Sequence, residues 1–290
     1  MKVRLIVNPV SGRGKGIRQL DSAVSSMVKH GIAPDVSFTE RTGDAASIAQ
    51  ASQGSFDVIA GLGGDGTMNE IASALRDTGV PMAVYPAGTG NDFIKTLGKD
   101  LSYDHISSAL ARGSTARVDM GMANGRPFVN VFGIGLDAVV TAGNARNRLT
   151  GLKISYVFAL ASALARYRQY PLSVHINGET IRADALSLCT GNGPVCGGVF
   201  RLTPEALVDD GLLDITLLSG LPLRALPFHI HKAFNGRISE TPYTRMFRTR
   251  KLSISSDIPL PAHIDGEVLD PYLDSYDIEI LPGALTVIRP

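Results

Sequence analysis

Short apolar runs alternate with helix-like segments through the first half of the chain. The strand-like runs cover residues 2–7, 35–39, 56–62 and 81–85. The helix-like segments that follow them cover residues 16–30, 44–52, 68–76 and 92–97. Strands that alternate with helices form a parallel sheet with helices packed on its faces. The pattern therefore predicts an α/β domain over residues 1–123, whose ligands bind at the carboxyl ends of the strands.

The rhythm changes near residue 124, which predicts a second domain over residues 124–290. Its first part, at 135–145 and 151–170, has the spacing of helices. Strand-like runs then dominate, at 172–176, 179–188, 212–218, 251–255, 262–264, 276–281 and 284–288. Asn177-Gly178 joins the first two of these runs and is typical of a two-residue hairpin turn. We expect a mainly antiparallel domain, with a cleft between it and the first.

Composition excludes several classes of protein. The formal net charge of +1 lacks the basic excess that nucleic-acid binders usually carry, so we expect no nucleic-acid partner. Two cysteines are too few for a disulfide framework or a zinc site, and we take Cys189 and Cys196 as structural. The uncharged run 154–165 is shorter than the ~20 apolar residues of a membrane span. We therefore expect a cytoplasmic protein whose membrane contact is peripheral.

The most informative segment, residues 61–70, places four glycines around Asp65 between a buried strand and a helix. Glycines let the backbone turn sharply and approach a ligand, and the free N–H groups of the helix start then face an anion. A plain strand-to-helix turn is the alternative, but it needs only one or two glycines. The segment also matches the dinucleotide pattern Gly-x-Gly-x-x-Gly, which is weak evidence alone.

Two features favour a metal–nucleotide complex over a dinucleotide in this turn. A dinucleotide site has an acid at the end of the next strand to hold a ribose, whereas this strand ends in residues 85–88 without one. Asp65 lies inside the turn, where it would repel a pyrophosphate unless a cation lay between them. Mg²⁺ bound to ATP supplies that cation. We therefore expect ATP and Mg²⁺ rather than NAD.

Two further glycine-bearing turns follow other strands, at residues 8–12 and 88–92. The basic residues after the first turn do not complete a Walker A loop, because no Gly-x-x-x-x-Gly-Lys-Ser/Thr occurs. Each turn, taken alone, is equally consistent with a simple connection between a strand and a helix. Because the carboxyl ends of parallel strands share one edge of a sheet, we expect the three turns to converge there.

The second half offers two acidic segments. Residues 207–212 supply carboxylates and turn carbonyls, the oxygen ligands that a hard cation prefers. Asp265 and Glu267 are two residues apart, so they share a face if the segment is a strand, and Gly266 can bend it. Paired acids can provide a general base. Plain turns are the alternative for both segments. We interpret a third, basic segment as a solvated face that can also touch anionic lipid: Arg245, Arg248, Arg250 and Lys251.

Taken together, these motifs resemble the diacylglycerol kinase catalytic-domain family, and within it the soluble bacterial lipid kinases related to sphingosine kinases. The likeness covers essentially the whole chain. It is carried, in order, by residues 8–12, 63–67, 88–93, 203–206, 209–211 and 265–267. The glycine–Asp turn is shared with NAD kinases and phosphofructokinases. The resemblance implies an N-terminal domain of that fold and a C-terminal β-sandwich.

The resemblance also implies an activity, transfer of the γ-phosphoryl group of ATP to a lipid hydroxyl, and the residues that serve it. Asp65 would organise the metal–phosphate complex, and Glu267 would accept the hydroxyl proton with Asp265 beside it. Leu207 and Leu212, through carbonyls, and Asp210, through its carboxylate, would hold a structural Mg²⁺. The residues implied to surround ATP are Asn8, Pro9, Val10, Ser11, Gly12, Thr39, Gly63, Gly64, Asp65, Gly66, Thr67, Met68, Asn69 and Thr89.

The sequence departs from the family pattern at two places. Residues 195–198 are less rich in glycine than the family's run, which bears on the shape of the lipid pocket. Gly90 stands where Ala or Val is usual. An NAD kinase and a non-catalytic nucleotide sensor are the competing interpretations. The acceptor stays open among diacylglycerol, a long-chain base, phosphatidylglycerol and a polyprenol, and a homodimer is left open.

Overall fold

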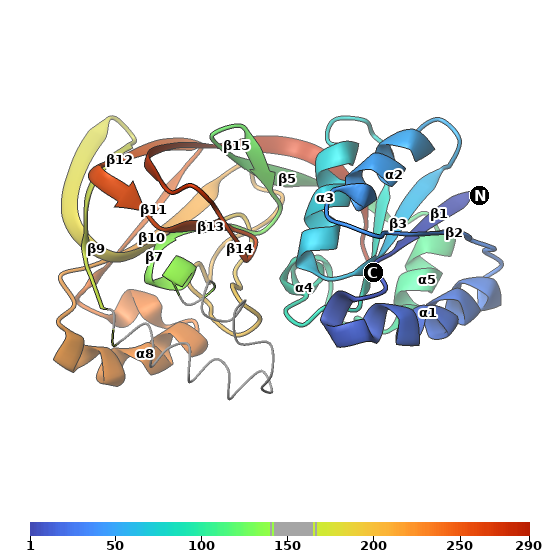
Figure 1. The fold of residues 1–290 in the computed structure, drawn as a ribbon, viewed down its shortest axis with the longest axis horizontal. Helices are drawn as coiled ribbons and strands as arrows, with labels where there is room; N and C mark the ends of the chain where they lie inside the picture. The colour runs from blue at the N-terminus through green and yellow to red at the C-terminus, as the bar shows by residue number, and fades with distance from the viewer. Residues whose placement is uncertain (140, 142–164, 166) are drawn as a thin grey trace. The chain divides into compact units, whose positions relative to one another are not determined.

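The computed structural model describes residues 1–139, 141, 165 and 167–290 (Figure 1). The chain forms two compact units. The first comprises Met1–Met120 together with Pro282–Pro290, and the second comprises Gly121–Leu281. The helix expected at 135–145 begins directly after Gly135, and its residues 140 and 142–145 lie outside the described residues, as does most of the helix expected at 151–170. None of the described helices is both long and apolar enough to span a membrane.

The first unit is built on a parallel sheet, as the alternating pattern predicted. Its strands lie in the order β4, β3, β1, β2, and each neighbouring pair is parallel. The strands are β1 (Val3–Val7), β2 (Asp35–Phe38), β3 (Val58–Gly63) and β4 (Met82–Pro86). Every residue of β3 is buried, which is typical of a central strand covered on both faces.

Helices cover both faces of this sheet (Figure 1). They are α1 (Ser11–Lys29), α2 (Asp44–Ser52), α3 (Asp65–Leu75), α4 (Asp92–Leu97) and α5 (Tyr103–Ala111). α1 packs beside α5, and α2 packs beside α3. The first turn of α1 is irregular, because Gly12, Arg13 and Gly14 have positive φ angles. The regular helix therefore starts close to residue 16, where the sequence predicted it.

Residues 282–290 return to the first unit, although the sequence analysis grouped them with the second. Strand β15 (Leu273–Ile288) runs from one unit into the other, and Val287 near its end pairs in parallel with Met82 of β4. Ile288 is buried in the core that the sheet shares with α1 and α5. Strand β5 (Thr115–Ala123) also spans the boundary of the two units and pairs with β15.

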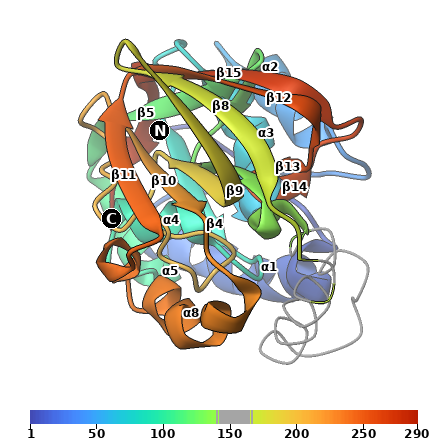
Figure 2. The same cartoon turned by 90° about the vertical axis from the view of Figure 1, so that its left-hand side faces the viewer.

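The second unit is mainly antiparallel, as expected (Figure 2). Asn177 and Gly178 both have positive φ angles and form the predicted two-residue turn between β8 and β9. Its core contains Phe128, Phe132 and Tyr276 among many aliphatic side chains. Its further strands are β6 (Arg126–Phe128), β7 (Val131–Gly135), β8 (Tyr170–Ile176), β9 (Glu179–Gly191), β10 (Leu213–Ser219), β11 (Thr244–Thr249), β12 (Lys251–Leu260), β13 (Ala262–Ile264) and β14 (Glu267–Val268).

One helical segment of the second unit has no counterpart in the sequence analysis. It consists of the short 3₁₀ helix η1 (Leu223–Ala225) and the α-helix α8 (Leu226–Phe234), followed by the 3₁₀ helix η2 (Ile238–Glu240). Pro227 lies in the first turn of α8, where a proline is tolerated because its missing N–H has no partner within the helix.

Candidate active site

In the first unit, the glycine–Asp turn leads from β3 directly into α3. Gly64 is the N-cap residue of α3, and it offers no side chain to the N–H groups of the first turn. The N-terminus of a helix carries partial positive charge and open N–H donors, which together favour an anion. The turn therefore has the local geometry of a phosphate site.

The three glycine-bearing turns contact one another, as their positions at the strand ends predicted. Asn8 Nδ2 donates to Thr67 Oγ1 at 3.0 Å, which joins the first turn to the start of α3. A Cβ atom added to Gly88 would lie 2.5 Å from Gly64 Cα. The backbones of these two turns can therefore approach this closely only because both positions are glycine. A Cβ atom on Gly12, whose φ is +56°, would lie 2.2 Å from the carbonyl oxygen of Ala87.

Asp65 holds the third turn in place. Its Oδ1 accepts the backbone N–H of Asp92 at 2.6 Å and that of Phe93 at 3.4 Å, so it caps the N-terminus of α4. A Cβ atom added to Gly90 would lie 2.8 Å from Asp65 Oδ2. With this backbone, the alanine or valine that is usual at position 90 would crowd the carboxylate. The glycine at position 90, where the family usually has Ala or Val, therefore leaves room for the Asp65 carboxylate.

The other residues implied for ATP have varied surroundings. Thr39 follows β2, is buried, and donates its N–H to the carbonyl of Val7 at 2.9 Å. Ser11 Oγ lies near Gly64, since a Cβ atom there would be 3.1 Å from it. The Met68 side chain is buried against Gly61 in the core. The exposed members are Val10 and Thr89, and the partly buried ones are Pro9, Gly66 and Asn69, while Gly63 is buried in β3.

Sequence reasoning missed the role of Glu70 beside this site. Its two carboxylate oxygens accept the backbone N–H groups of Gly43 at 2.9 Å and Ala45 at 3.1 Å. Glu70 thus ties α3 to the start of α2 and to the loop that follows Thr39. Its place in the same motif as Asp65 was the available signal, but the motif alone does not identify the partner of an acidic side chain.

In the second unit, Asp265 and Glu267 lie in a tight hairpin and not along one strand. Asp265 and Gly266 have φ angles of +47° and +86° and form the turn between β13 and β14. Glu267 is consequently the partner of Ile264 across the hairpin. The bend that Gly266 was expected to allow is therefore present: two successive positive φ angles reverse the chain between the two acids, so they do not share a strand face.

The carboxylate of Asp265 binds three backbone N–H groups. Oδ2 accepts from Val129 at 2.8 Å, and Oδ1 accepts from Asn130 at 3.0 Å and from Val131 at 2.7 Å. Glu267 has an exposed side chain on the other side of the turn. These three bonds anchor the hairpin to residues 129–131, and Glu267 is the acid of the pair with the exposed side chain.

His263, on β13, lies close to a second acid, Asp137. The His263 side chain is fully buried, and its Nδ1 accepts the backbone N–H of Gly266 at 3.3 Å. Nδ1 therefore acts as an acceptor, which leaves Nε2 as the ring nitrogen that carries a proton. Nε2 faces Asp137 Oδ2 at 3.4 Å. The two side chains meet over Gly133, where an added Cβ atom would lie 2.0 Å from Asp137 Oδ2 and 2.5 Å from His263 Nε2.

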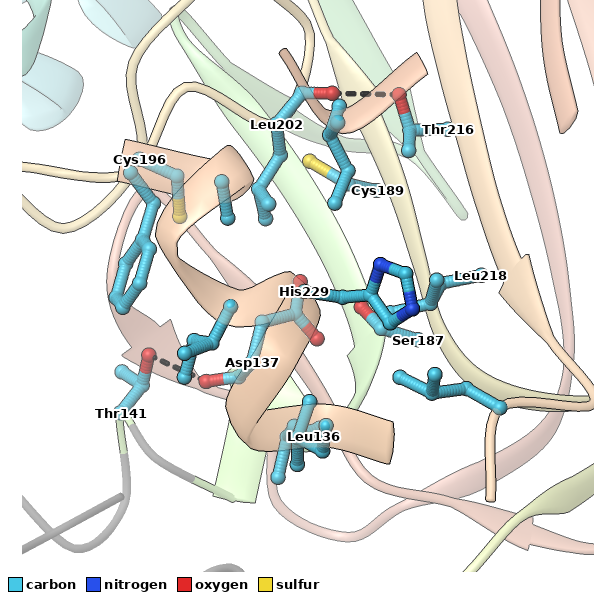
Figure 3. A pocket seen from close by; sticks show the side chains of 16 residues that line it. Leu136, Asp137, Thr141, Ser187, Cys189, Cys196, Leu202, Thr216, Leu218 and His229 are labelled. Atoms are coloured by element: carbon cyan, nitrogen blue, oxygen red, sulfur yellow. Dashed lines mark hydrogen bonds between the residues drawn. The ribbon is translucent and has the colours of Figure 1, made fainter. Parts of the chain in front are cut away.

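An apolar cavity of about 90 Å³ opens within the second unit beside Asp137 (Figure 3). Most of its lining is aliphatic or aromatic, with Asp137, Thr141, Ser187, Thr216 and His229 as polar members. Both cysteines also line it as free, buried thiols, in agreement with their structural interpretation. Burial raises the pKa of the Cys189 thiol well above its ordinary value, and the Asp137 carboxylate raises it further, so this thiol is unreactive.

In the segment expected to hold a structural Mg²⁺, Asp210 already pairs with a cationic side chain from strand β11. Asp210 Oδ1 accepts the N–H of Leu212 at 3.0 Å, and Oδ2 forms an ion pair with Arg248. Arg248 also reaches Asp214, with 3.3 Å between Nε and Oδ2. Leu207 is exposed, and the described residues contain no group of three His, Cys, Asp or Glu side chains suited to a metal. Both Asp210 oxygens have protein partners, so a Mg²⁺ at this carboxylate would compete with Arg248.

Two known families account for nearly the whole chain. Residues 2–123 match the diacylglycerol kinase catalytic domain, and residues 130–289 match the YegS C-terminal NAD kinase beta sandwich-like domain. A probable YegS-like lipid kinase of Shewanella frigidimarina is 30% identical over 99% of this chain and 94% of its own length. The chain belongs to this family of lipid kinases. The family implies ATP as the phosphoryl donor.

Other relatives of the family have similar coverage. A diacylglycerol kinase of Staphylococcus aureus strain MRSA252 is 26% identical, over 92% of this chain and 86% of its own length. The crystal structure of a candidate diacylglycerol kinase from Bacillus anthracis str. Sterne covers 100% of this chain and 97% of its own, with a TM-score of 0.81 and 26% identity. Both units therefore have counterparts in these relatives.

Proposed function

We propose that this lipid kinase transfers the γ-phosphoryl group of ATP to the hydroxyl of diacylglycerol or of a lipid with a similar apolar tail. The observation that carries the choice of acceptor is the cavity of the second unit, whose lining is mostly apolar. Small-molecule sites are usually concave and mostly apolar, with a few polar groups that fix the orientation of the ligand. An apolar lining favours the hydrocarbon part of a lipid over a polar acceptor. The diacylglycerol kinases among the relatives support the same class of acceptor.

The first unit provides the nucleotide site in this proposal. Phosphoryl transfer depends on positioning and on neutralising charge rather than on covalent chemistry with the protein. The turns at Gly12, Gly64 and Gly88 bring backbone close to the phosphates, and the open N-terminus of α3 faces them. Mg²⁺, when bound with ATP, supplies the positive charge that offsets the phosphates. Asp65 would hold the turns together and organise that charge.

The second unit provides the acceptor site and the base. Glu267 would accept the proton of the lipid hydroxyl as the new bond to phosphorus forms. Asp265 would keep the hairpin in place through its three bonds to backbone N–H groups. Such an enzyme meets its acceptor at a membrane surface, so we include peripheral membrane contact in the proposal. A homodimer is tested separately, by sedimentation of the purified protein.

Labelled ATP offered with a panel of lipids in mixed micelles tests this proposal. The panel contains diacylglycerol, a long-chain base, phosphatidylglycerol and a polyprenol, and NAD serves as a control because the second unit matches an NAD kinase-like domain. We expect a phosphorylated lipid and no phosphorylated NAD. Phosphorylation of NAD alone, or ATP binding without turnover of any acceptor, would overturn the proposal.

A further inference from the structure

Helix α8 has an inner face that belongs to the apolar cavity. Leu226, His229, Ile230 and Ala233 line the cavity, and their spacing of three and four residues places them along one side of the helix. The side chains of Leu226 and Ala233 are buried. The inner face of α8 is therefore fully used by the core of the second unit.

The outer face of α8 carries apolar side chains that nothing described in the structure covers. Phe228 is 74% exposed, and Leu223, in η1 just before the helix, is 47% exposed. Single exposed apolar residues are common, but here two large ones lie within five residues on a helical segment at the surface of the unit (Figures 1 and 2). A phenyl ring this exposed to water is suited to contact with an apolar partner such as the interior of a lipid bilayer.

Within residues 221–236 the charged side chains have one sign, although Lys232 forms an ion pair with Glu240 just beyond them. Residues 221–236 contain no Asp or Glu, but they contain Arg224, Lys232 and two histidines. Phe228 and His231 are exposed, and their spacing of three residues places them on the same side of α8, while Arg224 is exposed in η1 just before the helix. An apolar centre with cationic neighbours on a helical face is the pattern of segments that rest on anionic lipid.

We propose that η1 and the outer face of α8 dock on a phospholipid bilayer that contains anionic lipids. Phe228 and Leu223 enter the interface, and Arg224 contacts the anionic headgroups. Because the inner face of the same helix lines the cavity, the docked helix would bring the cavity close to the lipids of the bilayer. This inference rests on the proposed function for its purpose, but the docking itself can be measured without catalysis.

Flotation with lipid vesicles tests the docking directly. The full chain is mixed with vesicles of phosphatidylcholine alone, or of phosphatidylcholine with phosphatidylglycerol. We expect binding to the anionic vesicles, weakened about tenfold by Phe228→Ser because one aromatic side chain no longer leaves water. Phe38→Ser is the matched control, since Phe38 is 48% exposed but lies in the first unit, and we expect it to bind like the wild type.

A second variant and an activity assay separate this inference from the proposed function. Arg224→Glu should remove the preference for anionic over neutral vesicles. Phe228→Ser should lower phosphorylation of a vesicle-borne acceptor but leave phosphorylation of a water-soluble, short-chain acceptor unchanged, because Phe228 does not line the cavity. Failure of the wild type to bind vesicles, or wild-type binding by Phe228→Ser, would overturn the docking. Binding without phosphorylation of any acceptor would overturn only the proposed function.

Discussion

Asp265 Oδ1 accepts the backbone N–H of Val131 at 2.7 Å, across the sheet register that joins β13 to β7. The backbone N–H groups of Val129 and Asn130 also donate to Asp265, so three donors surround its carboxylate. Hydrogen bonds to a charged group are each worth about 1.5–3 kcal/mol. Asp265 therefore stabilises the hairpin that presents Glu267, and the two acids should respond differently to substitution.

Glu267→Gln should lower kcat by roughly 10²–10⁴, the usual effect of losing a general base, and should leave the KM for ATP and the melting temperature unchanged. The amide has nearly the same shape but cannot accept the proton. Asp265→Asn is the companion variant, and it should lower the melting temperature because an amide nitrogen cannot accept the N–H bonds. Full turnover by Glu267→Gln, with an inactive but stable Asp265→Asn, would reverse the two assignments.

Asp65→Asn and Asp65→Ala separate capping of α4 from organisation of the metal–phosphate charge. The Asn variant keeps an oxygen that can accept the N–H of Asp92, so its melting temperature should stay close to that of the wild type. The Ala variant should melt earlier, since losing a helix cap costs about 0.5–2 kcal/mol. We expect both variants to lose turnover. Near-normal kcat in a folded Asp65→Asn enzyme would limit Asp65 to the cap.

Gly133→Ala should destabilise the second unit by about 1–3 kcal/mol, as expected for overpacking of a core. The added methyl group would occupy the space in which His263 Nε2 faces Asp137 Oδ2. Urea denaturation measures the change in the free energy of unfolding. Asp137→Ala removes the nearer atom of the clash, so Gly133→Ala should cost less in that background. Equal costs in both backgrounds would show that the clash lies elsewhere.

Mg²⁺ without nucleotide should not change the melting temperature of the wild type, because Arg248 already pairs with Asp210 and Asp214. Arg248→Met leaves two acids without their cation, and Mg²⁺ should then raise its melting temperature, since a cation that binds only the folded state stabilises it. Adding Asp210→Asn to the Arg248→Met variant should abolish that gain. A clear rise for the wild type would restore a structural Mg²⁺ held by Leu207, Asp210 and Leu212.

Asp214→Asn should gain stability relative to the wild type as the pH rises. Burial raises the pKa of the Asp214 carboxyl above 3.8, although Arg248 partly opposes the shift. The folded wild type therefore holds this proton more tightly than the unfolded chain, and it loses stability as the pH rises from about 3.8 through the raised pKa. The Asn variant has no such loss. Melting temperatures of both proteins over this window test the sign, and a difference that is constant or falls with pH would contradict it.

Local sequence patterns predicted those features that are determined locally. The alternation of strands and helices predicted the parallel sheet of the first unit. Asn177-Gly178 predicted the hairpin turn between β8 and β9. Both features depend on residues that are close together along the chain. The contact between the three glycine-bearing turns followed from parallel topology alone. Glycines at 12, 64 and 88 were informative because close backbone approach excludes every other residue.

Partners distant in sequence could not be predicted in the same way. Nothing near Asp210 indicates Arg248, which comes from β11, and nothing near Asp265 indicates the N–H groups of residues 129–131. An acidic side chain in a turn serves equally well as metal ligand, base, cap or anchor until its neighbours are known. For Asp265 and Glu267, Gly266 indicated a possible bend, but the sequence did not reveal the positive φ at Asp265 that completes the turn.

The return of residues 282–290 to the first unit has a consequence for how the protein is made. Val287 and Ile288 complete the sheet and core of the first unit, yet they leave the ribosome only after the whole second unit. Domains generally fold as units during synthesis, the N-terminal one first. Here the order is constrained in the opposite direction: the second unit can fold while the first still lacks a strand, and a fragment ending near residue 120 would expose the edge of β4 that Val287 covers.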